Sequence, residues 1–297
     1  MRENYDEYKM MVDEHLLDFI PAVDPISKTL YDSMKYSLMA GGKRLRPVLL
    51  LAACEFAGGD STAALPFACA MEYIHTYSLI HDDLPAMDDD EMRRGVPTNH
   101  IVYGPGIATL AGDGLLNTAF EIMLKNMYIR FDDPDKLKKR INAAYAIAKG
   151  AGIGGMVAGQ VADLEAESQE ASAEVLDYIH LNKTAAMIRA AIEAGLYLGD
   201  PDEDMIRNMT VYAECLGLAF QIADDILDVS GNAEEMGKGV GEDAKNDKLT
   251  YVSMHGIEEA REKLHELTQR AVDAIAEYYD NALFFRELVL KLENRSS

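Results

Sequence analysis

The sequence predicts a single all-α domain. Most of the 297 residues lie in amphipathic or wholly apolar runs at helical spacing, whereas alternating strand patterns are scarce and Asn-Gly hairpin signals are absent. A hydrophobic fraction of 48% is ample for a large buried core. No linker-like shift in composition and no repeat of fixed period divides the chain. We therefore expect one helical bundle spanning residues 1–297.

The predicted helices follow the apolar periodicity and end near glycine or proline. The first contains Tyr5, Tyr8, Val12, Leu16 and Phe19, and Pro21 ends it. Further helices are expected over 44–57, 62–81, 106–129, 136–168, 173–198, 203–229, 257–279 and 281–293. Helices 62–81 and 203–229 are apolar on nearly every face, so we expect them at the centre of the bundle. Segment 230–250, with four glycines and three lysines, is predicted to be a mobile lid over a charged site.

Composition excludes several classes of protein. The chain has 28 Lys and Arg against 51 Asp and Glu, a net charge of −23, which argues against nucleic-acid binding and against docking on anionic membranes. Cys54, Cys69 and Cys215 form no CxxC pair and lie in apolar runs, so we expect buried, reduced thiols. A charged N-terminal segment and the lack of eighteen consecutive uncharged apolar residues predict a cytoplasmic protein without a membrane span.

Two acidic clusters lie at the ends of the two helices expected at the centre of the bundle. The first, within 82–91, contains Asp82, Asp83 and Asp88, and Pro85 should turn its later aspartates back towards the earlier ones. An isolated acidic run is usually an exposed helix end. Here, however, a second cluster of Asp224, Asp225 and Asp228 ends helix 203–229, and Asp224 and Asp228 project from one helix face. Oxygen-rich clusters of this kind suit Mg²⁺ better than a soft metal.

Basic residues lie beside these clusters despite the acidic composition. They are Lys43, Arg44 and Arg46 at a glycine-rich helix start, Arg93 and Arg94 after the first cluster, and Lys183, Lys238 and Lys248 later in the chain. A single basic residue is usually a solvated surface charge. Together with two cation-binding clusters, these residues indicate a substrate with several phosphate oxygens. The surrounding apolar helices favour a diphosphate that carries a hydrocarbon tail.

These motifs resemble those of the trans-prenyltransferases, or polyprenyl diphosphate synthases, over nearly the whole chain. The run from Asp82 to Asp88 is similar to the family's first aspartate-rich motif, in the form with two extra residues, and Asp224 to Asp228 is similar to the second. Further matching segments, in order, are Gly42–Pro47, Arg93–Thr98, Gly112-Asp113, Gly159-Gln160, Lys183-Thr184 and Phe220-Gln221. The resemblance implies a helical bundle of the isoprenoid synthase type with a central catalytic cavity, usually a homodimer.

The resemblance also implies residue roles. Three Mg²⁺ ions on an allylic diphosphate would be bound by Asp82, Asp83, Asp88, Asp224 and Asp228. That diphosphate would be bound by Arg93, Lys183, Thr184, Gln221 and Lys238, with Lys248 a further substrate-binding candidate. Isopentenyl diphosphate would be bound by Lys43, Arg46, His75 and Arg94. Asp225 and Lys183 join Asp82, Asp83, Asp88 and Asp224 as candidate catalytic residues. The implied reaction is ionisation of dimethylallyl or geranyl diphosphate and head-to-tail attack by isopentenyl diphosphate.

Tyr77 and Ser78 are the candidate chain-length residues. Tyr77 lies five residues before Asp82, about 7.5 Å along the helix at about 1.5 Å per residue, where its ring would close the cavity. In the family an aromatic residue here, combined with the two-residue insertion, goes with farnesyl diphosphate, and Ser78 leaves room for that product. We therefore predict farnesyl diphosphate. The alternatives are ordinary core packing of Tyr77 and a geranylgeranyl product.

Other classes of protein account for fewer of these features. A terpene cyclase or a head-to-head synthase would share the helices but would need no pocket around Lys43 and Arg46. A noncatalytic synthase subunit would show degraded aspartate motifs, whereas both are intact here. A plain acidic scaffold protein would not explain the basic residues.

Overall fold

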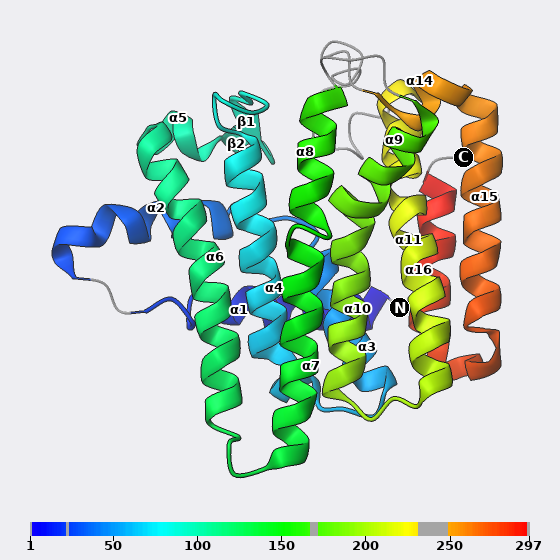
Figure 1. The fold of residues 1–297 in the computed structure, drawn as a ribbon, viewed down its shortest axis with the longest axis horizontal. Coiled ribbons are helices and arrows are strands. Elements are labelled where there is room, and N and C mark those ends of the chain that lie inside the picture. The colour runs from blue at the N-terminus through cyan, green and yellow to red at the C-terminus, as the bar shows by residue number, and fades with distance from the viewer. Residues whose placement is uncertain (1, 22–23, 167–171, 231–248, 296–297) are drawn as a thin grey trace.

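The computed structural model describes residues 2–21, 24–166, 172–230 and 249–295 (Figure 1). Long helices pack side by side, and the only strands in these described ranges form a short antiparallel hairpin that pairs Met92 with Pro97 and Arg93 with Val96. The elements are α1 (Arg2–His15), η1 (Pro25–Ser27), α2 (Lys28–Leu38), α3 (Leu45–Phe56), α4 (Ser61–Asp82), β1 (Met92–Arg93), β2 (Val96–Pro97), α5 (Asn99–Tyr103), α6 (Pro105–Tyr128), α7 (Pro134–Ala151), α8 (Met156–Ala166), α9 (Ala173–Ile179), η2 (His180–Ala185), α10 (Ala186–Leu198), α11 (Glu203–Ser230), α14 (Tyr251–His255), α15 (Ile257–Ala274), η3 (Ala276–Ala282) and α16 (Leu283–Arg295). The all-α prediction is confirmed.

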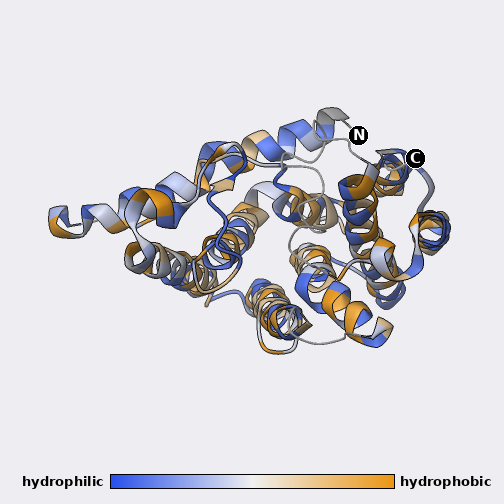
Figure 2. Cartoon of the chain, turned by 90° about the horizontal axis from the view of Figure 1, so that it is seen from above, coloured by the Kyte–Doolittle hydropathy of each residue, from blue (hydrophilic) through white to orange (hydrophobic). Residues whose placement is uncertain are grey.

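The two helices expected at the centre of the bundle, α4 and α11, pack into its interior. Helix α4 packs against α3, α6 and α10, with further contacts to α1, α2 and α7. Helix α11 lies between α10 and α15 and also contacts α16. Seen end-on in Figure 2, hydrophilic residues are prominent on outer helices such as α15. The three cysteines are buried and free, in agreement with the prediction of reduced thiols.

Several predicted boundaries were wrong. The expected helix 136–168 is two helices, because the chain breaks between Ala151 and Met156 at a glycine-rich turn. The expected helix 173–198 contains a π-helical turn over 180–185. The expected helix 257–279 ends at Ala274, and Tyr279, with φ of 47°, marks the break before α16. Helix α2 was missed, although Leu30, Met34 and Leu38 have helical spacing.

Helix α6 is, within the described ranges, the one helix whose length and composition would allow it to cross a membrane. The core helices of soluble proteins meet the same criterion, and 44% of its most apolar stretch is buried inside the protein, where it packs against α4 and α2. The opposite side of α6 exposes Leu110, Leu124 and Tyr128. This helix is therefore part of the bundle and also presents apolar side chains at the surface.

Candidate active site

Both acidic clusters lie at the same end of the bundle. Helices α4, α8 and α11 all run towards the upper end in Figure 1, and they finish there at Asp82, Ala166 and Ser230. The hairpin β1–β2 lies at this end as well, and the π-helical turn η2 packs against both α8 and α11. Residues far apart in sequence are therefore brought to one rim by parallel helix directions.

The first cluster folds back on itself after Pro85, as predicted. Helix α4 ends at Asp82, and the backbone N–H of Asp88 donates to the Asp82 carbonyl at 2.9 Å. Asp89 adopts a positive φ of 51° within this return. The turn thus places the two outer aspartates of the motif, Asp82 and Asp88, next to each other.

The electrostatics of the first cluster favour a bound cation. The pKa of Asp82 is raised to about 6, chiefly by burial and also by the charges of Asp88 and Asp83, although Lys183 and Arg93 act to lower it. Asp83 is buried and accepts from Arg93 Nε at 2.6 Å, and Arg93 also reaches Asp90 at 3.1 Å. A cation beside Asp82 and Asp88 would offset the repulsion that raises this pKa.

In the second cluster, Asp225 is held by hydrogen bonds within the protein. Its side chain accepts from Gln221 Nε2 at 2.9 Å and from the backbone N–H of Tyr251, at the start of α14, at 2.7 Å. Thr184 Oγ1 donates to Gln221 Oε1 at 2.9 Å. This chain of bonds connects η2, α11 and α14, and it joins three residues that the sequence singled out separately. Asp228 is also buried, while Asp224 is half-buried.

Lys183 forms an ion pair that the sequence analysis missed. Its Nζ lies 2.5 Å from Asp163 Oδ2 on α8. Asp163 follows Gly159 by four residues, so both lie on one face of α8. This spacing from a motif residue was the sequence feature that pointed to Asp163. Gly159 itself faces the backbone of η2, because a Cβ there would lie 2.1 Å from Lys183 N. The absence of a side chain at Gly159 therefore lets α8 approach the π-helical turn that carries Lys183.

A second group of cationic residues surrounds His75. Arg46 Nη1 lies 3.5 Å from His75 Nε2, and burial, with the charges of Arg46 and Arg94, holds the pKa of His75 well below its usual range. Burial lowers the pKa of Arg46 and of Arg94. The buried Nε of Arg46 has no hydrogen-bond partner among the described residues. Half-buried guanidinium groups with an unused donor form a pocket suited to an anion.

Gly42 allows Arg94 to join this group. Gly42 has φ of 127°, and a Cβ there would lie 2.6 Å from the Arg94 guanidinium carbon. Arg94 donates to the carbonyl of Gly41 across the same turn. Arg44, in contrast, does not join the cationic group: its side chain is buried and pairs with Glu72 and Asp13. Arg44, which the sequence analysis grouped with the neighbouring basic residues but did not assign to a substrate, thus pairs with carboxylates of the protein itself.

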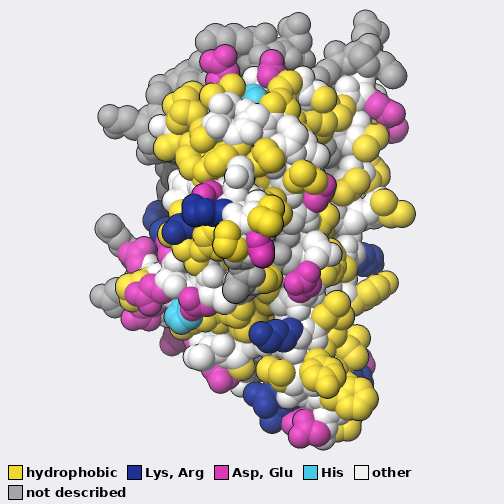
Figure 3. All heavy atoms as spheres, turned by 90° about the vertical axis from the view of Figure 1, so that its left-hand side faces the viewer, with side chains coloured by type: hydrophobic (Ala, Val, Ile, Leu, Met, Phe, Trp, Pro, Cys, Tyr) yellow, Lys and Arg dark blue, Asp and Glu magenta, His cyan; other side chains and the backbone are white. Residues whose placement is uncertain are grey.

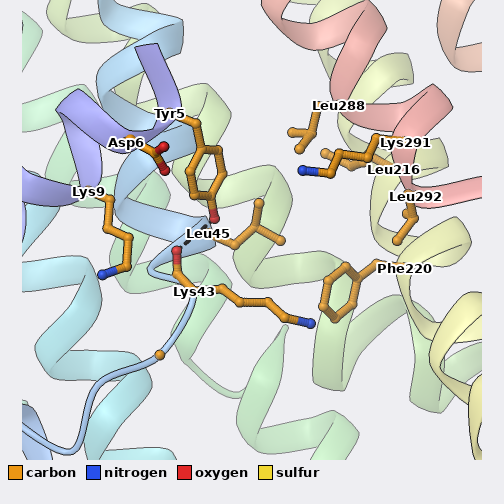
Figure 4. Close-up of a pocket in the computed structure, with 11 residues that line it drawn as sticks. Tyr5, Asp6, Lys9, Lys43, Leu45, Leu216, Phe220, Leu288, Lys291 and Leu292 are labelled. Atoms are coloured by element: carbon orange, nitrogen blue, oxygen red, sulfur yellow. Dashed lines mark hydrogen bonds between the residues drawn. The ribbon is translucent and has the colours of Figure 1, made fainter. Parts of the chain in front are cut away.

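A pocket of about 650 Å³ opens beside Lys43 (Figure 4). Its apolar wall comes from Leu45, Leu216, Phe220, Leu288 and Leu292, on α3, α11 and α16. The Lys43 side chain extends towards the Phe220 ring, with Nζ 6.0 Å from the ring centroid, and Tyr5 donates to the Lys43 carbonyl at 2.6 Å. The sequence analysis missed this pocket, because it joins segments from both ends of the chain.

The two candidate chain-length residues have different surroundings. Tyr77 is buried, and its ring meets that of His81 edge-on at a centroid distance of 5.6 Å. Ser78 Oγ donates to the carbonyl of His75 at 2.9 Å, so its hydroxyl is used within α4. Tyr77 is thus a large side chain in a fixed position one and a half turns before Asp82.

The described residues contain no group of three or more His, Cys, Asp or Glu side chains that could alone hold a metal ion. Mg²⁺ is usually held by one or two carboxylates together with water and substrate phosphates, so separate carboxylates still suit this ion. Lys238, Lys248 and nearly all of the predicted lid lie outside the described residues.

Comparison with known proteins identifies the class. Residues 27–282 match the sequence model of the polyprenyl synthetase family. A geranylgeranyl diphosphate synthase of Cyanophora paradoxa is 45% identical over 93% of this chain and 89% of its own. A farnesyl diphosphate synthase of Geobacillus stearothermophilus is 46% identical over 87% of this chain and 86% of its own. A solved FPP/GFPP synthase of Zymomonas mobilis superposes with a TM-score of 0.85, with 32% identity and 98% of each chain covered.

The chain therefore belongs to the polyprenyl synthetase family. It is a prenyltransferase that elongates prenyl chains, and the resemblance drawn from the motifs is confirmed. Members of this family use divalent metal ions and prenyl diphosphate substrates. Its relatives include both farnesyl and geranylgeranyl diphosphate synthases, so the family alone leaves the product length open.

Replacing Gly159 tests the close approach of α8 to η2. Gly159→Ala should lower the free energy of unfolding by about 1–3 kcal/mol, because the new methyl group meets backbone atoms that cannot move aside. Gly154→Ala is the matched control, since nothing lies within 4 Å of a Cβ at that position. Chemical denaturation of both variants measures the difference. Equal stability of the two would show that the approach is less tight than the structure indicates.

Proposed function

We propose that this protein condenses isopentenyl diphosphate head to tail with dimethylallyl or geranyl diphosphate, giving farnesyl diphosphate and diphosphate. One observation carries the proposal. A carboxylate-rich rim at the ends of α4 and α11 and a separate cationic pocket around His75 lie in one helical bundle. The first arrangement suits a diphosphate that arrives with metal ions, and the second suits a diphosphate that arrives without them.

The carboxylates at the ends of α4 and α11 would hold the metal. Asp82 and Asp88 lie together after the turn at Pro85, with Asp83 beside them, and Asp224 and Asp228 end α11. We propose Mg²⁺, three ions in all, which would neutralise charge on the allylic diphosphate as it leaves. The raised pKa of Asp82 fits this role, since a bound cation would favour the ionised carboxylate.

The protein's own groups would do the remaining work. Lys183 and Arg93 lie near Asp82 and would stabilise the departing allylic diphosphate as the carbon–oxygen bond breaks. Thr184 and Gln221, which are joined by a hydrogen bond, would orient this diphosphate together with Lys238 and Lys248. Arg46, Arg94, His75 and Lys43 would hold isopentenyl diphosphate so that its double bond attacks the allylic cation. The released diphosphate would accept the proton that restores a double bond.

Tyr77 supports a fifteen-carbon product. Its ring is buried in α4 and is fixed against His81, five residues before the metal-binding end. A growing chain that extends along α4 from the diphosphate would meet this ring, and close packing resists its displacement. The geranylgeranyl alternative requires the chain to pass Tyr77.

We further propose a homodimer that forms through the exposed apolar side of α6. Hydrophobic side chains gather on the face of the molecule shown in Figure 3, and Leu110, Leu124 and Tyr128 of α6 contribute to the exposed apolar surface. An apolar surface of this kind is typical of an interface between subunits. We also expect a cytoplasmic protein.

Removing a carboxylate from either cluster should abolish most activity. Asp82→Ala and Asp224→Ala are each expected to lower kcat by at least about 100-fold, because each removes charge stabilisation from the ionising diphosphate. The steady-state rate of condensation measures this loss. Asp89→Asn is the control, because Asp89 is exposed, and Asn tolerates its positive φ. Full activity in either Ala variant would contradict the two-cluster mechanism.

Shortening Tyr77 should lengthen the product. Tyr77→Ala is expected to shift the main product from fifteen carbons to twenty or more, because the ring no longer blocks the growing chain. Tyr77→Phe keeps the ring and should keep the fifteen-carbon product. Chromatographic sizing of the dephosphorylated products distinguishes the two. An unchanged profile in an active Tyr77→Ala enzyme would assign the chain-length limit to another residue.

Introducing a positive charge on the exposed apolar side of α6 should dissociate the proposed dimer into single chains. Leu124→Lys is expected to give the mass of a single chain, because the lysine would have to be buried in the interface. Met10→Lys, an equally large change at an exposed residue of α1, should leave the mass unchanged. Light scattering after size-exclusion chromatography provides the mass. A monomeric unmodified protein would rule out the dimer.

A further inference from the structure

We propose that Glu72 is a positioning residue for the isopentenyl diphosphate pocket, acting through Arg44. The inference rests on the proposed function, since it concerns how the pocket of Arg46, His75 and Arg94 is held. The motif comparison gave Glu72 no role, and Glu72 lies within an apolar stretch of α4, ten residues before Asp82.

The carboxylate of Glu72 is fully buried in the centre of the bundle, where its charge must be compensated. The Glu72 side chain is 1% exposed, and its neighbours Met71, Tyr73 and Ile74 belong to the core. Burying an ionised carboxylate is costly unless a charged partner and hydrogen bonds compensate. The compensation comes from Arg44, whose Nη1 lies 2.6 Å from Glu72 Oε1. The two side chains therefore form a closed ion pair inside the protein.

Arg44 connects this ion pair to three helices. Besides Glu72 on α4, its guanidinium donates to Asp13 Oδ1 on α1 at 2.8 Å and to the carbonyl of Leu38 at the end of α2 at 2.6 Å. The planar guanidinium fork suits such divergent partners, and lysine cannot reproduce them. The side chain at the start of α3 is thereby fixed from three directions.

Fixing Arg44 fixes the turn that presents the cationic side chains. Arg44 has φ of 53°, a left-handed conformation that is unfavourable for arginine, and it directly precedes α3. On one side of this turn Lys43 extends towards Phe220, and on the other Arg46 reaches His75. The ion pair with Glu72 holds the strained residue in place, so Lys43 and Arg46 keep their separate directions.

Glu72 also supplies negative charge to the pocket itself. It precedes His75 by three residues, so both lie on one face of α4, and Arg46 adjoins His75. Its second oxygen is buried and has no hydrogen-bond partner among the described residues. The charge of Glu72 favours the ionised forms of both Arg46 and Arg94. Glu72 thus limits repulsion among guanidinium groups that lie close together before a diphosphate arrives.

The variant Glu72→Gln tests this role, because it keeps the size of the side chain and removes its charge. The KM for isopentenyl diphosphate should rise about tenfold or more, by analogy with the loss of groups that orient metal ligands. The KM for the allylic diphosphate should stay within about twofold, and kcat at saturating substrate should change little. Arg44→Lys should act in the same way. An unchanged or lower KM for isopentenyl diphosphate in Glu72→Gln would overturn the proposal.

The adjacent residue Tyr73 provides a control for lost stability alone. Tyr73 is fully buried, and its hydroxyl donates to the carbonyl of Leu16, which is not a partner of Arg44. Tyr73→Phe should lower the melting temperature and leave both KM values unchanged. If Glu72→Gln merely weakened the fold, it would behave like Tyr73→Phe. The double variant Arg44→Lys/Glu72→Gln should raise the KM for isopentenyl diphosphate by less than the product of the two single effects, because the two changes break an ion pair that they share.

Calorimetric titration with isopentenyl diphosphate alone separates this inference from the proposed function. If the unmodified protein condenses no starter, the proposed function fails, but the affinities of unmodified protein and Glu72→Gln can still be compared. A tenfold weaker affinity of the variant supports the positioning role. Equal affinities, or no binding by the unmodified protein, overturn it.

Discussion

The burial of α4 on all sides constrains the rest of the molecule. A helix with apolar residues around its whole circumference must be enclosed, and α4 is enclosed by α3, α6 and α10. Its carboxylates can then be tolerated only where the helix leaves the core, at Asp82 and beyond. Glu72 is the exception inside the bundle, and it is accompanied by the buried guanidinium of Arg44. The position of the acidic rim at the end of α4 and the internal ion pair of Arg44 and Glu72 thus both follow from the burial of α4.

Negative and positive side chains are concentrated in two separate parts of the bundle, and the proposed function assigns one diphosphate to each. Asp82, Asp83 and Asp88 accumulate negative charge at the rim, and Lys183 and Arg93 only partly offset it. Arg46 and Arg94 accumulate positive charge beside His75. In a buried setting these charges interact more strongly than in water. A metal-bearing diphosphate would reduce the first accumulation and a metal-free diphosphate would reduce the second, which is why the proposed function places the two substrates separately.

The fold and the motif positions could be predicted from the sequence, because both depend on local pattern. Helical periodicity identified α3, α4, α6 and α11 closely, and Pro85 predicted the return of Asp88 to Asp82. The π-helical turn at Lys183 could not be predicted, since the helical periodicity of 173–198 runs through it unchanged, and the contact of Gly159 with this turn comes from another helix. The direction of the Arg44 side chain could not be predicted from the sequence either. A basic residue between Lys43 and Arg46 has the same local pattern whether it faces substrate or Glu72, and only tertiary packing decides.

The central claim is that two diphosphate-binding sites in one bundle join isopentenyl diphosphate to an allylic partner. The most direct measurement incubates the purified protein with Mg²⁺, isopentenyl diphosphate and, separately, dimethylallyl, geranyl or farnesyl diphosphate, and then sizes the prenyl chains. The account predicts accumulation of fifteen carbons from the first two starters and slow extension of the third. Rapid extension of farnesyl diphosphate would contradict the assignment of Tyr77. Absence of condensation with every starter would contradict the claim itself.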